Sequence, residues 1–177
     1  MRGRARRHTG AVAPARRNSL TGRLTGSARV TPPEPHATLR TRLANGAHVA
    51  ITPVLGARSV SVIVASRIGS AFESPAEQGI SHFVEHMLFK GTSNRTGLEI
   101  DHSIQEAGGH INAYTSFDRT VYHVTIPDTG AKLATEVLCD IMQNASLPEE
   151  ELAGELDVIR REMDMGNGDP SRRAGRR

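Results

Sequence analysis

The sequence has one cysteine, no tryptophan and only 3% aromatic residues in a chain of 177 residues. Because Cys139 has no second cysteine to pair with, an internal disulfide is excluded. No run of about 18 apolar residues occurs, so we expect no membrane-spanning helix. No apolar segment of a secretory signal follows the basic start. We therefore do not expect a secreted, disulfide-stabilised protein.

The remaining composition is that of an ordinary globular protein. Hydrophobic residues make up 37% of the chain and charged residues 23%, which are common values for soluble domains. A chain of this length buries roughly two-thirds of its unfolded surface, so its core needs no disulfide. The length and composition predict one soluble domain.

Basic residues are concentrated at the two ends of the chain. Residues 1–33 hold eight Arg and no acidic residue, and the last seven residues hold four more Arg. The stretch between them has ten basic residues and all 19 acidic ones, so the net charge of +3 describes the ends rather than the folded part. Because that part is acidic and has no basic helix, we expect no nucleic-acid partner.

We divide the chain into three parts. Residues 1–35 have few large apolar side chains and no helical period, and they end in a proline cluster, which predicts a disordered Arg-rich tail. A mitochondrial-type targeting segment, a nucleic-acid-binding arm and a wrongly assigned start codon are alternatives for this tail. Residues 36–170 are expected to form the domain, and residues 171–177 a second Arg-rich tail.

Hydrophobic periodicity predicts strands and helices in alternation. The expected strands lie near residues 39–43, 49–54, 59–66, 110–116 and 120–126, and Asn45-Gly46 is a hairpin turn between the first two. The expected helices lie near residues 79–89, 98–107, 131–144 and 149–165. The strand at 59–66 has apolar residues on both faces, which predicts that it is well buried. This order favours an α+β fold in which helices cover a mostly antiparallel sheet.

The segment His82-Phe83-Val84-Glu85-His86 lies inside a predicted helix. Residues three and four positions apart share a helix face, so the two histidines and Glu85 lie together. Two imidazoles one turn apart can bind the same zinc ion, and an adjacent carboxylate can take a proton from water. This H-x-x-E-H order predicts an inverzincin peptidase site. On these three residues alone, a solvent-exposed polar helix face stays an alternative.

A catalytic zinc ion needs a third protein ligand, and a downstream helix offers candidates. Glu155 and Glu162 are seven positions apart, so they lie on nearly the same face of that helix, at the border of an apolar stripe. The stripe consists of Leu152, Leu156, Ile159 and Met163. A carboxylate at such a border can reach a buried metal, although a solvent-exposed acidic helix is the alternative reading.

Four segments in the same order resemble the pitrilysin/insulinase family of zinc metallopeptidases, most closely its processing-peptidase-like branch. They are residues 79–92 (GISHFVEHMLFKGT), 108–115 (GGHINAYT), 118–122 (DRTVY) and 158–162 (VIRRE). The resemblance extends from about Thr38 to Pro170. It implies an α+β fold that forms one incomplete half of a clam-shell metallopeptidase.

The resemblance also implies roles for individual residues. It makes His82, His86 and Glu162 the ligands of one zinc ion, Glu85 the general base, and Glu155 a residue that orients the ligands. A further implication is a substrate-binding edge strand, to which an extended peptide adds main chain to main chain. The substrate-binding residues would be Gly109, Asn112 and Ala113.

The implied function is that of a zinc metalloendopeptidase that hydrolyses peptide bonds in extended or presequence-like substrates. Members of this branch are built from two related halves, so we expect this chain to need a second homologous half or subunit. The alternative is a truncated, catalytically inactive fragment, or a non-catalytic partner subunit that keeps the fold. The expected compartment is the bacterial cytoplasm, with the mitochondrial matrix as the alternative.

Overall fold

The structure is a computed structural model that describes residues 37–168. The two predicted Arg-rich tails, residues 1–35 and 171–177, lie outside the described residues. The chain divides into two compact units, one that ends at Pro53 and one that begins at Val54. Among the described helices, none combines the length and the apolar composition needed to cross a membrane.

The first unit contains an antiparallel hairpin. Its strands are β1 (Leu39–Arg42) and β2 (His48–Ile51). In the turn between them Gly46 has a φ of 91°, a left-handed conformation that glycine adopts without steric cost. The side-chain oxygen of Asn45 accepts a hydrogen bond from the backbone N–H of Ala47 at 3.0 Å. The hairpin predicted from Asn45-Gly46 is confirmed.

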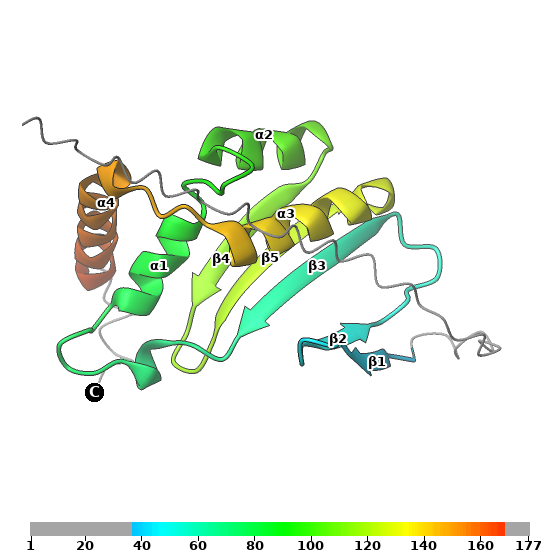
Figure 1. Cartoon of the computed structure of the whole chain (residues 1–177), viewed down its shortest axis with the longest axis horizontal. Helices are drawn as coiled ribbons and strands as arrows, with labels where there is room; N and C mark the ends of the chain where they lie inside the picture. The colour runs from blue at the N-terminus through cyan, green and yellow to red at the C-terminus, as the bar shows by residue number, and fades with distance from the viewer. Residues whose placement is uncertain (1–36, 169–177) are drawn as a thin grey trace, which may run out of the picture. The chain divides into compact units, whose positions relative to one another are not determined.

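Between residues 54 and 168 the second unit holds a three-stranded antiparallel sheet and four α-helices (Figure 1). The sheet order is β3 (Ser59–Ser66), β5 (Thr120–Pro127) and β4 (His110–Thr115). The helices are α1 (Ile80–Leu88), α2 (Gly97–Glu106), α3 (Ala131–Asn144) and α4 (Glu149–Gly168). Two short 3-10 helices, η1 (Ser70–Phe72) and η2 (Asp128–Gly130), precede α1 and α3. All predicted strands and helices are present, and the predicted α+β class is confirmed.

The core of the second unit lies between the sheet and the helices α2 and α3. Figure 1 shows α3 lying along the sheet. The fully buried side chains include Ile100, Ile104, Val124, Ile126, Val137, Leu138 and Ile141. In α3 these residues recur at helical spacing, so one face of the helix is apolar and packs on β5. The sheet and these two helices therefore share one core.

The prediction that the strand at 59–66 is well buried is wrong. Its valines are partly buried against the core, whereas the alternate residues are exposed, and Ile63 is 60% exposed. Within the described residues, β3 is an edge strand that pairs with β5 alone. Apolar residues on both faces of a strand show a preference for β structure, but they do not show that both faces are covered.

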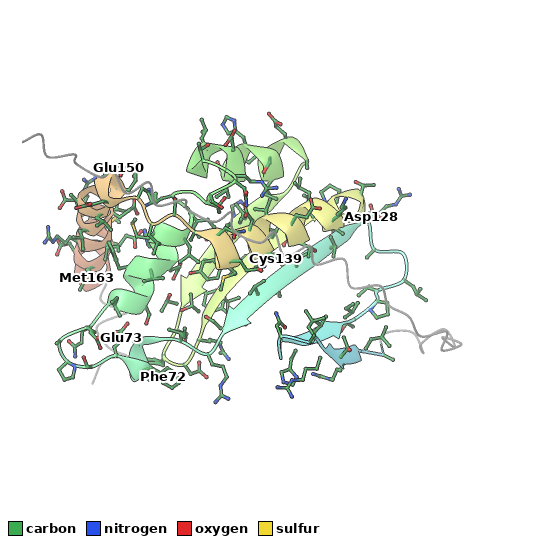
Figure 2. The ribbon with its side chains drawn as sticks, viewed as in Figure 1. Phe72, Glu73, Asp128, Cys139, Glu150 and Met163 are labelled. Carbon is green, nitrogen blue, oxygen red and sulfur yellow. The ribbon has the colours of Figure 1, made fainter. Side chains whose placement is uncertain are left out.

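The apolar stripe predicted for α4 is only partly buried. Leu156 and Met163 are 43% and 61% exposed, and Figure 2 labels Met163 on this helix. Within the stripe Ile159 is buried, and so is Glu155 at its border. The side of α4 that contacts α1 therefore includes a carboxylate within the packed surface. A buried carboxylate requires polar partners, and α1 supplies them.

Candidate metal centre

Helix α1 carries the H-x-x-E-H motif, and Glu73 fixes where this helix begins. The Glu73 carboxylate accepts hydrogen bonds from the backbone N–H groups of Gly79 and Ser81, at 2.7 and 2.9 Å. These bonds satisfy donors that a helix start leaves free, and they lower the pKa of Glu73. Figure 2 shows Glu73 in the loop that leads into α1. These contacts fix the start of the helix that carries the motif.

His82, His86 and Glu162 place one potential ligand atom each around a common point. The Nε2 atom of His82 lies 3.2 Å from Nε2 of His86 and 3.5 Å from Oε2 of Glu162. The third distance, from His86 Nε2 to Glu162 Oε2, is 3.7 Å. In a tetrahedral zinc site with bonds of about 2.0–2.2 Å, ligand atoms lie about 3.3–3.6 Å apart. Both the ligand types and their spacing fit zinc.

Glu155 contacts the other ring nitrogen of His86. Its Oε2 atom lies 3.0 Å from His86 Nδ1, and its side chain is almost fully buried, with the residue 7% exposed. Lys90 contacts the second carboxylate oxygen, Oε1. Burial raises the pKa of Glu155, but the contacts with Lys90 and His86 bring it below its ordinary value. A carboxylate that accepts from Nδ1 directs Nε2 toward a metal.

Glu85 is a residue of α1, on the same side of this helix as the two histidines. Its carboxylate lies between α1 and β4. Its carboxylate is buried and accepts a hydrogen bond from the hydroxyl of Thr115 on β4. The pKa of the Tyr122 hydroxyl is raised, chiefly by its burial and to a smaller extent by the negative charge of Glu85. The Glu85 carboxylate is therefore fixed by the sheet and not by the group of potential zinc ligands.

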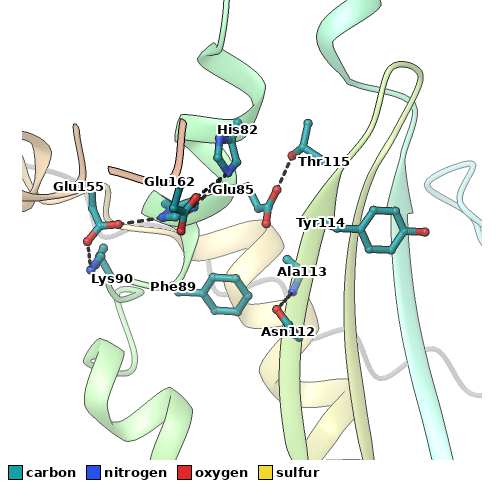
Figure 3. Close-up of a pocket in the computed structure, with 11 residues that line it drawn as sticks. His82, Glu85, Phe89, Lys90, Asn112, Ala113, Tyr114, Thr115, Glu155 and Glu162 are labelled. Atoms are coloured by element: carbon teal, nitrogen blue, oxygen red, sulfur yellow. Dashed lines mark hydrogen bonds and ion pairs between the residues drawn. The ribbon is translucent and has the colours of Figure 1, made fainter. Parts of the chain in front are cut away.

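The predicted site residues surround one open cavity of about 530 Å³, shown in Figure 3. The cavity is lined by His82, Glu85, His86, Phe89, Lys90, Asn112, Ala113, Tyr114, Thr115, Glu155 and Glu162. Helices α1 and α4 and strand β4 thus contribute to one site. The cavity includes every predicted site residue except Gly109.

Gly109 has a packing role at the start of β4. A Cβ atom at this position would lie 2.8 Å from Cγ1 of Ile126 and 3.0 Å from Cγ2 of Ile104. Only glycine allows the main chain to approach these core side chains so closely. Asn112 and Ala113, in contrast, line the cavity, and the Asn112 side chain accepts a hydrogen bond from the Ala113 N–H at 2.8 Å.

Four residues that line the cavity were not predicted to belong to the site: Phe89, Lys90, Tyr114 and Thr115. Two of them, Lys90 and Thr115, contact predicted site residues. Thr115 is two positions after Ala113 on the same strand, and this period of two places both side chains on one face of the sheet. That periodicity was available in the sequence as a signal. Lys90 lies just beyond the end of α1, and only the packing of α4 reveals its contact with Glu155.

Comparisons with known proteins agree with this geometry. Residues 49–174 match the model of the insulinase family, peptidase family M16. The chain is 44% identical over 123 residues to the "Probable mitochondrial-processing peptidase subunit beta, mitochondrial" of Arabidopsis thaliana, which covers 70% of this chain and 23% of that protein. It is 37% identical over 129 residues to an "Uncharacterized zinc protease" of Rickettsia bellii, covering 73% of this chain and 31% of the relative.

A solved structure shows the same fold. The crystal structure of a protease from Helicobacter pylori superposes with a TM-score of 0.69 at 30% sequence identity. The match covers 73% of this chain and 31% of that protein. The chain therefore spans about a quarter to a third of the length of these similar proteins.

Proposed function

The chain belongs to the insulinase family, peptidase family M16, and we propose that it carries the zinc site of a metalloendopeptidase. The observation that carries this proposal is the convergence of His82, His86 and Glu162, whose ligand atoms lie within 3.7 Å of one another. The name of the Rickettsia relative, a zinc protease, supports zinc as the metal.

Glu85 is the proposed general base. A zinc ion in this site would supply Lewis acidity, which polarises a peptide carbonyl and lowers the pKa of water. The Glu85 carboxylate opens into the cavity beside the proposed ligands, where it can accept the proton of the attacking water. Thr115 holds one carboxylate oxygen by a hydrogen bond, which leaves the other to take the proton and pass it to the leaving amine.

The proposed substrate is an extended peptide. Within the described residues β4 pairs with β5 alone, so its other edge is free to pair with a peptide main chain. Asn112 and Ala113 lie on this strand and line the cavity. The processing-peptidase name of the Arabidopsis relative supports presequence-like peptides as substrates. Gly109 would act by shaping the start of the strand rather than by contact with the peptide.

We further propose that a second homologous half or subunit covers the cavity. The side chains of His82 and Glu162 are 37% and 42% exposed, so the cavity is open to solvent on one side. Closing an active site positions the substrate and excludes bulk water. The alternative function is that of a non-catalytic partner subunit or an inactive fragment that keeps the fold. Relatives from a plant mitochondrion and from a bacterium support both proposed compartments, the bacterial cytoplasm and the mitochondrial matrix.

The test is cleavage of a quenched fluorescent basic peptide by the purified 177-residue chain. The assay is run with zinc, with a chelator, and with a separately expressed second half from a homologue. Zinc-dependent cleavage that requires the second half supports both the peptidase and the partner. Cleavage by the chain alone contradicts the partner requirement. A zinc-loaded chain that stays inactive with several homologous halves supports the non-catalytic alternative.

A further inference from the structure

Lys90 lies two residues beyond the end of α1, the helix that carries the H-x-x-E-H motif. Its side chain contacts α4. Its Nζ atom contacts Oε1 of Glu155 and lies 3.8 Å from Oε2 of Glu151. The other oxygen of Glu155 lies 3.0 Å from Nδ1 of His86. The Glu155 carboxylate therefore bridges an ammonium group and an imidazole, and Figure 3 shows the dashed contact between Lys90 and Glu155.

We propose that Lys90 is a positioning residue of the zinc site. Its ammonium group holds the Glu155 carboxylate so that Oε2 accepts the Nδ1 proton of His86 and Nε2 stays available to the metal. This inference rests on the proposed function, because it takes His86 to be a zinc ligand.

The burial of Glu155 explains why a cation is needed. A carboxylate that is 7% exposed has lost most of its hydration, and a buried charge is tolerated only when it is paired and hydrogen-bonded. A neutral imidazole gives Glu155 one hydrogen bond but no balancing charge. Without Lys90 the carboxylate would turn toward solvent, and this change would weaken its hold on His86.

The backbone keeps Lys90 in place relative to His86. The N–H of Lys90 donates to the carbonyl of Met87, three residues earlier, at 3.1 Å, so a tight turn of the 3-10 type follows α1. Lys90 leaves this turn on the side of Glu155, whose two carboxylate oxygens contact Lys90 Nζ and His86 Nδ1. Within residues 37–168, no other Lys or Arg forms an ion pair with Glu155.

The experiment is a double-mutant cycle on zinc affinity in the full chain. The variants are Lys90→Met, Glu155→Gln and the two combined, and the dissociation constant of zinc is measured by competition with a chelating dye. We expect Lys90→Met to weaken zinc binding by about tenfold or more, the usual effect of losing a group that supports a ligand. Lys90→Arg should restore most of the affinity. In the Glu155→Gln background, Lys90→Met should add no further loss, because its effect passes through that carboxylate.

A second measurement reports on His86 directly. Ring nitrogen NMR of the zinc-free chain should show a proton fixed on Nδ1 of His86 in the parent and a mixture of tautomers in Lys90→Met. Lys90→Gln serves where the methionine variant does not fold, as judged by circular dichroism. The matched control is Lys132→Met, which removes an exposed lysine that pairs with Glu136 on α3; it should leave both measurements unchanged.

The outcomes separate this inference from the proposed function. If His82→Ala loses zinc but Lys90→Met binds it as tightly as the parent, the zinc site stands and the role of Lys90 is overturned. Losses that add in the double variant also overturn it, because Lys90 would then act independently of Glu155. If His82→Ala binds zinc as tightly as the parent, the zinc site itself is wrong and the inference fails with it.

Discussion

The Nε2 atom of His82 lies 3.5 Å from the Oε2 atom of Glu162, although the two residues belong to the first and the last α-helix within the described residues. This contact exists because α4 packs on α1 through a face that includes carboxylates. The group of potential zinc ligands is therefore completed by tertiary packing. It forms only when α4 packs on α1.

Zinc content tests this relationship most directly. We expect the purified chain to bind about one equivalent of zinc, and His82→Ala or Glu162→Ala to lose most of it, since the remaining two ligands cannot complete a tetrahedral site. Metal analysis after dialysis measures the stoichiometry. His102→Ala removes an exposed histidine on α2 and should keep the parental content. Equal zinc in all four proteins would show that the metal binds elsewhere.

Much of the fold could be predicted because its signals are local. Strand and helix periods, the Asn45-Gly46 turn and the spacing of the motif in α1 all depend on residues close in the sequence. The family resemblance identifies Glu162 as the third ligand, and the structure brings its carboxylate within 3.7 Å of both histidines.

The errors arose where burial depends on distant parts of the chain. Hydrophobicity alone places Leu156 and Met163 toward the core. In the structure Glu155 faces inward instead, because Lys90 and His86 bind its carboxylate there. The periodicity of a single helix cannot reveal polar partners on another helix. For the same reason the contact between Lys90 and Glu155 could not be predicted before α1 and α4 were placed together.

Loss of the general base should affect turnover and spare the metal. In a chain completed by a second homologous half, Glu85→Gln should lower kcat by about two or more orders of magnitude, because the amide cannot take a proton from water. Zinc content should stay near the parental value, since Glu85 bonds Thr115 and not the proposed ligands. Glu106→Gln, at the exposed end of α2, is the matched control. Undiminished cleavage by Glu85→Gln would remove this residue from the mechanism.

Gly109 should matter for the stability of the fold, and Asn112 should not. A Cβ at Gly109 would meet Ile126 and Ile104 at 2.8 and 3.0 Å, so Gly109→Ala should lower the free energy of unfolding by about 1–3 kcal/mol, as overpacking does. Asn112→Ala removes an exposed side chain on β4 and should change stability by less than about 0.5 kcal/mol. Urea unfolding of both variants measures the difference. Equal stability of Gly109→Ala and the parent would contradict the packing role.

The loop between α1 and α2 is tied to α3 by one buried carboxylate. Asp140 accepts hydrogen bonds from the side chains of Thr92, Asn94, Arg95 and Asn144, at distances of 2.6 to 2.8 Å. Burial alone would raise the pKa of Asp140, but these four donors lower it from 3.8 to about 2. The ionised carboxylate therefore stabilises the folded chain.

Acid should weaken this stabilisation over a defined pH range. Because the pKa of Asp140 is lower in the folded chain than its ordinary value of 3.8, its contribution is complete above that value and is lost as the pH falls toward about 2. The full effect is about 2 kcal/mol. We expect the difference in unfolding free energy between the parent and Asp140→Asn to shrink by roughly 1.5 kcal/mol from about pH 5 to about pH 2.5, measured by urea unfolding. Asp118→Asn, at an exposed turn, should follow the parent throughout. A difference between the parent and Asp140→Asn that stays constant over this range would show that Asp140 titrates normally.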